Sequence, residues 1–231
     1  MNFRLKPEAA SKFPLLENGN VIEVADHTIF DRLNLKVTFE GRNNRLVIGR
    51  DFDVSKALHF HFPSHEGSII VGDRCYIGSG CIRAGHSCAI QIGNEVTATR
   101  DVFMEVVEGQ SITVGEDCML ATGVILRASD GHPIFDEGTG DRVNITRSIT
   151  IAGHVWVGDR ATILGGAEIG GGSVIGAAAL VKGSIPEKAL AVGVPAKTIR
   201  TGIVWSRKGL KRVKPGELEH SSGIKGEYAI R

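Results

Sequence analysis

The sequence has no apolar run that approaches the roughly 20 residues of a membrane-spanning helix. Its first residues, MNFRLKPEAASKFPLLENG, also lack the apolar core of a secretory signal. An excess of one charge is missing too, because 27 Lys and Arg residues are balanced by 26 Asp and Glu residues. Charge therefore does not favour binding to nucleic acid. We expect a cytoplasmic protein with no membrane span and no nucleic-acid partner.

Cysteine and aromatic residues are also few. The four cysteines form no Cys-x-x-Cys pair, so the sequence indicates neither a disulfide framework nor a metal site. Glycine, in contrast, accounts for 30 of 231 residues without a Gly-X-Y period, which excludes collagen. Hydrophobic residues make up 42% of the chain, which is too many for a disordered protein. The composition indicates an ordered fold with many tight turns.

A six-residue repeat is the strongest signal, and it is clearest from residue 151 onward. Fixed-period self-similarity of this kind is typical of a solenoid. The first position of each hexad is aliphatic: Ile151, Val157, Ile163, Ile169, Ile175 and Val181. The fifth position is mostly small: Val155, Ala161, Ala167, Ser173, Ala179 and Ile185. Two inward positions that lie two residues apart predict a short strand in every hexad.

The same phase recurs upstream with interruptions. The similar segments RLVIG, SIIVG, AIQIG, SITVG and SITIA end at residues 49, 72, 93, 115 and 152, at separations of 23, 21, 22 and 37. Three hexads make one triangular coil of 18 residues, so most intervals are one coil with small corner insertions. The last interval contains an excursion of 19 further residues, around 127–147. Long loops in compact repeats are often functional.

We therefore expect an all-β solenoid in three parts. Residues 1–44 are expected to cap the first coil with short strands, and residues 45–196 to form the β-helix domain. Residues 197–231 are expected to form a C-terminal helix or extended cap followed by a tail. Three cysteines fall on the small inward position of their hexads and are expected to be core residues: Cys75, Cys81 and Cys118.

The hexads, the loop ASDGHPIFDEGTGDRVN and the segment AVGVPAKTIR resemble the hexapeptide-repeat acyltransferases, especially the sugar and capsular-polysaccharide O-acetyltransferases. Galactoside and maltose acetyltransferases are similar at a greater distance. The resemblance covers roughly residues 45–205. It implies a left-handed parallel β-helix, a homotrimer, and acetyl-CoA bound in the groove between neighbouring prisms. It also implies acetyl transfer to a hydroxyl of a sugar or polysaccharide.

The resemblance assigns the general base to His132, in the motif SDGHPIFD of the long loop. A neutral imidazole near pH 7 suits that chemistry. Asp130 and Asp136 flank His132 and could orient its ring, although Asp residues in such loops more often form Asx turns. Glu105 and Glu108, one coil earlier, are candidate acceptor-binding residues. Arg142 and Asn144 are expected to pin the loop onto the coils.

Trp156 occupies an outward hexad position 24 residues after His132, as in the resembling acetyltransferases. It is expected either to contact the acetyl-CoA thioester or to pack in the trimer groove. The remaining cofactor-binding residues are carried over from the resemblance. They are Gly158 and Asp159 on one coil, Ala177 and Lys182 two coils further on, and Lys197 and Arg200 beyond the last coil. The basic run 207–214 either steers anionic ligands or forms a solvated surface.

Three alternatives remain open. The acceptor could be an antibiotic, serine or an amino sugar on the same scaffold. A γ-type carbonic anhydrase uses a similar prism, but its paired histidines are missing because His132 has no partner five residues away. A non-catalytic solenoid such as an ice-binding protein would show regular threonine ladders and would not require the long histidine loop.

Overall fold

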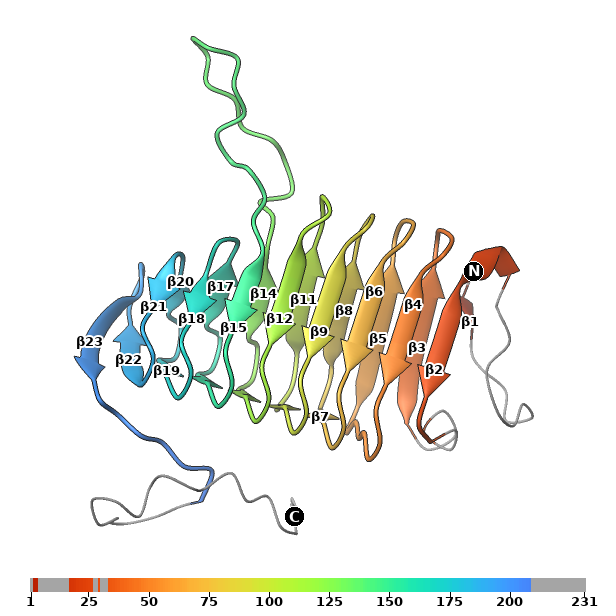
Figure 1. The fold of residues 1–231 in the computed structure, drawn as a ribbon, viewed down its shortest axis with the longest axis horizontal. Helices are drawn as coiled ribbons and strands as arrows, with labels where there is room; N and C mark the ends of the chain where they lie inside the picture. Colours follow the sequence, from red (N-terminus) through yellow and green to blue (C-terminus); the bar gives the residue numbers. More distant parts are fainter. Residues whose placement is uncertain (1, 4–16, 27–28, 30–32, 209–231) are drawn as a thin grey trace.

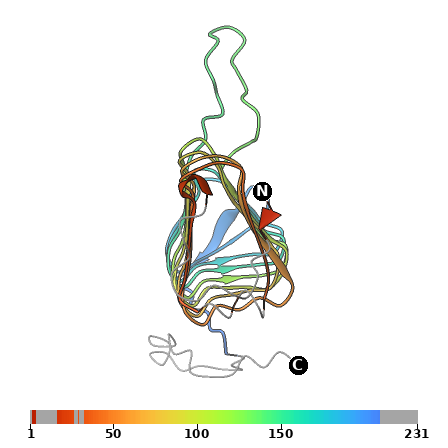
Figure 2. The same ribbon diagram turned by 90° about the vertical axis from the view of Figure 1, so that its right-hand side faces the viewer.

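The structure is a computed structural model that describes residues 2–3, 17–26, 29 and 33–208. In these residues the chain forms a parallel β-helix of triangular cross-section (Figures 1 and 2). It passes from sheet 1 to sheet 2 to sheet 3 in each coil between residues 68 and 181, whereas the two earlier coils have no strand in sheet 2. Viewed from the N-terminal end in Figure 2, it turns counterclockwise as it recedes, so the helix is left-handed. The all-β, left-handed solenoid implied by the resemblance is confirmed.

Each sheet forms one face of the prism. Sheet 1 contains β2 (Val21–Val24), β4 (Arg45–Ile48), β6 (Ser68–Val71), β9 (Ala89–Ile92), β12 (Ser111–Val114), β15 (Ile149–Ile151), β18 (Glu168–Ile169) and β21 (Ser184–Ile185). Sheet 2 contains β7 (Tyr76–Ile77), β10 (Thr97–Ala98), β13 (Met119–Leu120), β16 (Trp156–Val157), β19 (Val174–Ile175), β22 (Ala189–Val192) and β23 (Lys197–Thr201). Sheet 3 contains β1 (Asn2–Phe3), β3 (Asn34–Phe39), β5 (Ala57–Phe62), β8 (Gly80–Ala84), β11 (Val102–Val106), β14 (Ile125–Arg127), β17 (Thr162–Leu164) and β20 (Leu180–Val181). A 3₁₀ turn, η1 (Glu17–Gly19), precedes β2.

The core consists of ladders of inward side chains that run along the prism. Neighbouring strands pair in register, so each aliphatic first position of a hexad stacks on the one below. Burial of this apolar surface is the main stabilising term, at about 25 cal/mol per Å². The sheet 1 ladder is Ile48, Val71, Ile92, Val114, Ile151, Ile169 and Ile185, all buried.

The glycine that follows these aliphatic residues is required by the close stacking of the coils. A Cβ on Gly72 would lie 2.7 Å from the carbonyl carbon of Gly93. A Cβ on Gly93 would in turn lie 2.8 Å from that of Gly115. Real Cβ atoms do not approach backbone this closely. The Val-Gly and Ile-Gly pairs that end sheet 1 strands, such as Val71-Gly72 and Ile92-Gly93, therefore mark the edge where sheets 1 and 2 meet.

The parallel stack begins earlier than residue 45. Both β2 and β3 pair in parallel with the strands of the following coil, so they form a coil of their own. The sheet 3 strands of this coil and the next, β3 and β5, have six residues each and bury aromatic side chains in the core. The rings of Phe39 and Phe62, for example, stack at 4.8 Å.

The expectation for one of the cysteines needs correction. Cys81 does not face the core: Ile82 next to it is buried, and Cys81 lies half-buried on the outer face of sheet 3. A corner insertion after Ile77 shifts the phase there. Cys75 and Cys118 are buried as expected.

After the last coil the chain is extended and not helical, because β23 pairs antiparallel with β22. The expected tail lies largely outside the described residues. In the described part of the chain, no helix is long and apolar enough to cross a membrane.

Candidate functional site

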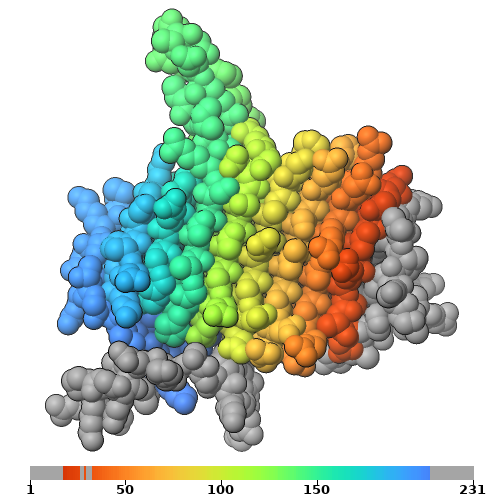
Figure 3. All heavy atoms as spheres, viewed as in Figure 1, coloured from red at the N-terminus to blue at the C-terminus, as the bar shows by residue number. Residues whose placement is uncertain are grey.

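The long loop, residues 128–148, leaves the corner between sheets 3 and 1 and projects away from the prism (Figures 1 and 3). Its outer part is a narrow hairpin, in which the Val143 N–H donates to the Ile134 carbonyl at 2.9 Å. At the tip, the carboxylate of Asp136 accepts hydrogen bonds from the N–H groups of Thr139 and Gly138. These backbone donors, Thr139 first, lower the pKa of Asp136. Asp136 therefore forms an Asx turn at the loop tip.

The base of the loop is anchored to the preceding coil by Glu108. Its carboxylate accepts hydrogen bonds from Thr146 Oγ1 at 2.5 Å and Arg142 Nη1 at 2.9 Å. The Thr146 hydroxyl and then the Arg142 guanidinium lower the pKa of Glu108. The expected anchoring role of Arg142 is confirmed. Glu108, a candidate acceptor-binding residue, uses both carboxylate oxygens to bind the loop in this structure.

Asn144 joins the two limbs of the loop beside His132. Its side-chain amide donates to the His132 carbonyl at 2.8 Å and to Asp130 Oδ2 at 3.1 Å. Its Oδ1 accepts from the Ile134 N–H at 2.6 Å. Asn144 thus pins the loop to itself and not to the coils.

The His132 side chain is exposed, and no residue of the described chain makes a hydrogen bond or ring contact with its imidazole. Asp130 is engaged by Asn144, and Asp136 by the tip of the loop. Neither carboxylate contacts the imidazole ring in this structure. The His132 carbonyl is bonded to Asn144, while its imidazole has no hydrogen-bond partner among the described residues.

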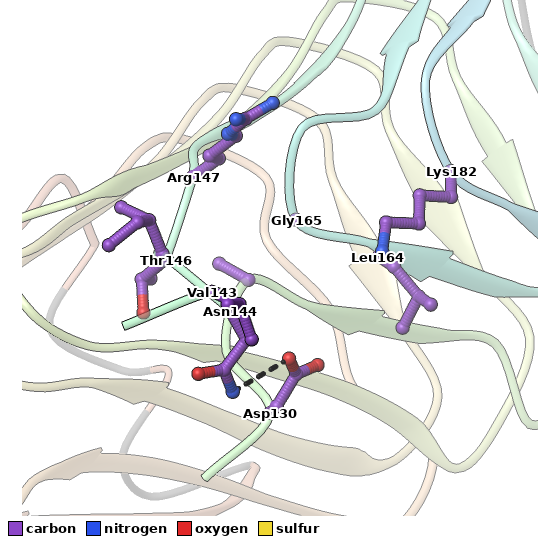
Figure 4. Close-up of a pocket in the computed structure, with 10 residues that line it drawn as sticks. Asp130, Val143, Asn144, Thr146, Arg147, Leu164, Gly165 and Lys182 are labelled. Atoms are coloured by element: carbon purple, nitrogen blue, oxygen red, sulfur yellow. Dashed lines mark hydrogen bonds between the residues drawn. The ribbon is translucent and has the colours of Figure 1, made fainter. Parts of the chain in front are cut away.

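A cavity of about 220 Å³ lies between the loop base and the ends of strands β17 and β20 (Figure 4). Its polar lining includes Asp130, Asn144, Arg147 and Lys182. Neither Arg147 nor Lys182 forms an ion pair with a described residue. The cavity therefore presents two unpaired cations close to the histidine loop.

Glu105 lies on the outer face of sheet 3 and is nearly buried, at 5% exposure. Arg83 approaches its Oε1 at 2.6 Å, and Arg127 approaches its Oε2 at 3.1 Å. Both carboxylate oxygens are therefore occupied by neighbouring coils. This arrangement leaves Glu105 little capacity to receive an acceptor.

Most of the expected cofactor residues gather along sheet 2 and its edge with sheet 3. Trp156 projects outward from β16 and is 38% exposed. Gly158 follows it at a corner, where an added Cβ would lie 2.7 Å from the Ala177 nitrogen. Ala177 is on the very next coil, not two coils further on, because Val157 pairs with Ile175. Asp159 accepts a hydrogen bond from the Thr122 N–H at 3.0 Å.

The structure divides the expected site into two groups. Trp156, Gly158, Asp159, Ala177, Lys197 and Arg200 belong to sheet 2, its edge with sheet 3, or the added strand β23. His132 and Lys182 belong to the corner between sheets 3 and 1, on the opposite side of the triangle (Figure 2). One chain therefore does not bring His132 and Trp156 together.

Sequence reasoning missed the cross-link between Asn144 and His132, and the placement of Lys182 beside the loop. The cross-link joins two irregular segments 12 residues apart, which no periodicity predicts. The sequence did carry a signal for Lys182, which lies four hexads after Gly158. Because one coil has three hexads, the fourth hexad places Lys182 at the next corner of the triangle. No three His, Cys, Asp or Glu side chains gather as a metal site within the described ranges.

The chain is similar to several known proteins, although no family model matches it. It is 36% identical over 143 residues to the polysialic acid O-acetyltransferase of Escherichia coli O1:K1 / APEC, a match covering 62% of this chain and 44% of that protein. It is 30% identical over 149 residues to the polysialic acid O-acetyltransferase of Neisseria meningitidis, covering 64% of this chain and 67% of that protein. The chain thus spans less than half of the Escherichia coli relative and about two thirds of the Neisseria one.

Among solved structures, the polySia specific acetyltransferase NeuO superposes with a TM-score of 0.74 at 35% identity. The superposition covers 84% of this chain and 81% of NeuO. The left-handed coil, the protruding loop and these matches agree. The chain belongs to the hexapeptide-repeat acetyltransferases, and among them it is similar to the polysialic acid O-acetyltransferases.

Proposed function

We propose that the protein transfers an acetyl group from acetyl-CoA to a hydroxyl of a sugar or polysaccharide, with His132 as the general base. The observation that carries this proposal is the free imidazole of His132, whose carbonyl is bonded by Asn144, on a loop whose base lines a polar cavity. His132 takes the proton of the acceptor hydroxyl as its oxygen attacks the thioester carbonyl. The new C–O bond forms, the C–S bond breaks, and the proton passes from His132 to the departing CoA thiolate.

The cysteines support direct attack without an acetyl-enzyme intermediate. Burial raises the pKa of Cys75 and of Cys118 to about 11. Burial also raises the pKa of Cys81 and of Cys88. Because the thiolate is the nucleophilic form, these thiols are poorly suited to attack a thioester. Four unpaired cysteines also fit a reducing cytoplasm, where we place the reaction.

Acetyl-CoA is proposed to lie along the edge of sheet 2, with the thioester near Trp156 and the pantetheine over Gly158 and Ala177. The flat surface there supports this placement, since Gly158 has no room for a side chain. Asp159 completes this edge, and Lys197 and Arg200 on the exposed strand β23 offer cations for the phosphates. Ala177→Trp should abolish the rise in melting temperature that acetyl-CoA produces, while the coils stay folded.

The separation of His132 from Trp156 supports a homotrimer in which the site is completed between neighbours. In the described residues, every exposed large hydrophobic side chain belongs to one of two patches. The loop patch consists of Ile134, Phe135, Val143 and Ile145, and the sheet-2 patch of Trp156, Val194, Ile199 and Val204. Two different patches that cover each other form a head-to-tail contact, and such contacts close into a ring when three successive rotations complete a full turn.

For the acceptor, we propose a sugar that carries a carboxylate. The two similar curated proteins are named for polysialic acid, an anionic polymer. The unpaired Lys182 and Arg147 at the cavity suit such a ligand, because an Arg binds a carboxylate with paired hydrogen bonds. Lys182 lines the cavity beside the loop and lies away from the sheet 2 edge where acetyl-CoA is proposed to bind. We therefore assign Lys182 to the acceptor and not to a CoA bound to the same chain.

The test is acetyl-CoA consumption with a panel of neutral and acidic glycans, nucleotide sugars, serine and amino sugars. Free thiol is measured as it is released, and the mass of the product locates the acetyl group. We expect thiol release that depends on a glycan, gives an O-acetyl ester and is lost in His132→Ala. Transfer to an amine only, or thiol release that needs no acceptor, contradicts the proposal.

A further inference from the structure

A segment that follows β23 runs back along the prism and is held by an arginine and a buried tryptophan. We call residues 202–208 the C-terminal strap. It starts at the last coil, where the Ile203 N–H donates to the Lys188 carbonyl at 3.0 Å. It then runs back toward earlier coils, below the body in Figure 1, and reaches Arg207.

Arg207 fastens the strap to distant coils. Its side chain is only 10% exposed, and its Nε donates to Asp117 Oδ1 at 2.7 Å. Nη1 donates to Thr97 Oγ1 at 2.7 Å, and Nη2 donates to the Cys118 carbonyl at 2.8 Å. These partners precede Arg207 by about 90 to 110 residues in the sequence. Charge-assisted hydrogen bonds at a mostly buried guanidinium are among the stronger polar contacts in proteins.

Trp205 is the apolar part of the strap, with 7% exposure. Its ring stacks on His154 at 4.2 Å with an interplanar angle of 9°. Its Nε1–H donates to the His154 carbonyl at 2.9 Å. His154 Nδ1 lies 2.6 Å from Asp117 Oδ2, so one carboxylate holds both the stacking ring and the arginine of the strap. This arrangement leaves Trp205 little freedom to rotate.

Trp156 is the neighbour of this fixed ring. Its indole stands on the flat outer face of sheet 2, in register with Met119 on one side and Val174 on the other. These neighbours lie on the preceding and following coils, so they flank the indole along the prism axis. The indole stays open in the direction of its own strand. Trp205 supplies a wall on that open side, with ring centroids 6.1 Å apart and an angle of 47°. The distance is within the range of favourable aromatic pairs.

We propose that Trp205, held by Arg207, is a positioning residue for Trp156: it fixes the indole against which the acetyl-CoA thioester binds. The positioning follows from the contacts described here. Its consequence for acetyl-CoA rests on the proposed function. Trp205 itself is nearly buried and is not placed against the ligand.

Fluorescence tests the positioning without any substrate, because Trp156 and Trp205 are the two tryptophans of the chain. In Trp205→Ala and Trp205→Phe, the emission comes from Trp156 alone. We expect the acrylamide quenching constant of Trp156 to be about twofold higher in Trp205→Ala, because a second face of the indole opens to solvent. Trp205→Phe retains a ring and should keep the lower value.

Arg207→Ala in the Trp205→Phe background should raise the quenching constant to the value of Trp205→Ala. Arg50→Ala is the matched control, since Arg50 forms an exposed ion pair with Asp73 at the same edge of the prism. It should leave the quenching unchanged. Circular dichroism of each variant verifies that the coils are intact. Equal quenching constants in all folded variants overturn the proposal.

Kinetics then test the consequence. Trp205→Ala should raise the KM for acetyl-CoA about three- to tenfold with kcat within about twofold, and Trp205→Phe should restore KM. A quenching change without a KM change overturns the role in cofactor binding. If the wild-type protein does not use acetyl-CoA at all, the proposed function fails, and the quenching of Trp156 still decides whether Trp205 positions it.

Discussion

The side-chain amide of Asn144 donates a hydrogen bond to the backbone carbonyl of His132 across the neck of the loop, at 2.8 Å. The same side chain accepts from the Ile134 N–H, so it holds the His132 segment on both sides. The imidazole remains unbonded within the described chain. A rigid backbone with a free ring is the arrangement that a general base needs before its substrate arrives.

Asn144→Ala should lower kcat about 10- to 100-fold, because His132 is then held less well in its reactive position. The stability of the coils should change little, since the loop lies outside the prism. Single-turnover rates and thermal melting measure the two effects. Thr139→Ala at the loop tip is the matched control and should keep most of the activity. If Asn144→Ala is as active as this control, the cross-link does not position His132.

Phe135→Asp should weaken the trimer, because it places a charge in the loop patch, where Phe135 is 58% exposed. Sedimentation velocity of the wild-type protein should give three times the chain mass of 24.7 kDa. The variant should shift toward single chains and lose activity together with assembly. A wild-type protein that sediments as a single chain at micromolar concentration contradicts the shared site.

Gly72→Ala should destabilise the fold, because the new methyl group meets the backbone of the next coil at 2.7 Å. Overpacking of this kind costs about 1–3 kcal/mol, and the rigid coil neighbour favours the upper end. Gly109→Ala is the comparison, since a Cβ there meets nothing within 4 Å and only its positive φ is unfavourable. The cost at Gly109 should be about 1 kcal/mol. Urea unfolding that ranks the two glycines in the opposite order contradicts the stacking argument.

Glu108 should make the anchoring of the loop depend on pH. Its folded pKa is lowered below 4.5 by Thr146 and Arg142. The stabilisation is therefore present above pH 4.5 and is lost as pH falls through the lower, folded value. Glu108→Gln should reduce stability at pH 7, and its difference from wild type should shrink as pH falls below 4.5. A difference that stays constant with pH means that the carboxylate charge does not anchor the loop.

The repeat made most of the fold predictable, because a period of six fixes which side chain of every hexad faces inward. Ile151, Ile169 and Ile185 stack as expected. The prediction failed at Cys81, where a corner insertion moved the phase. The repeat does not reach the first coil, whose strands β2 and β3 nevertheless pair in parallel with the next coil.

The sequence allowed the residues of the candidate site to be chosen, but not the contacts between them. The loop and His132 could be found because they interrupt a regular pattern. The contacts of the loop join irregular segments, so Asn144 had no periodic signal for its hydrogen bond to His132. The contacts of Arg207 span about 100 residues and depend on where the chain returns after β23, which no local pattern encodes.

The rate of acetyl transfer in a single turnover by His132→Ala tests the central claim most directly. Acetyl-CoA and acceptor are held at saturation, and acetyl-CoA affinity is measured separately by the rise in melting temperature. The proposed mechanism predicts a rate lowered about 10²- to 10⁴-fold, with acetyl-CoA affinity and folding unchanged. A variant that keeps more than about a third of the wild-type rate contradicts His132 as the general base.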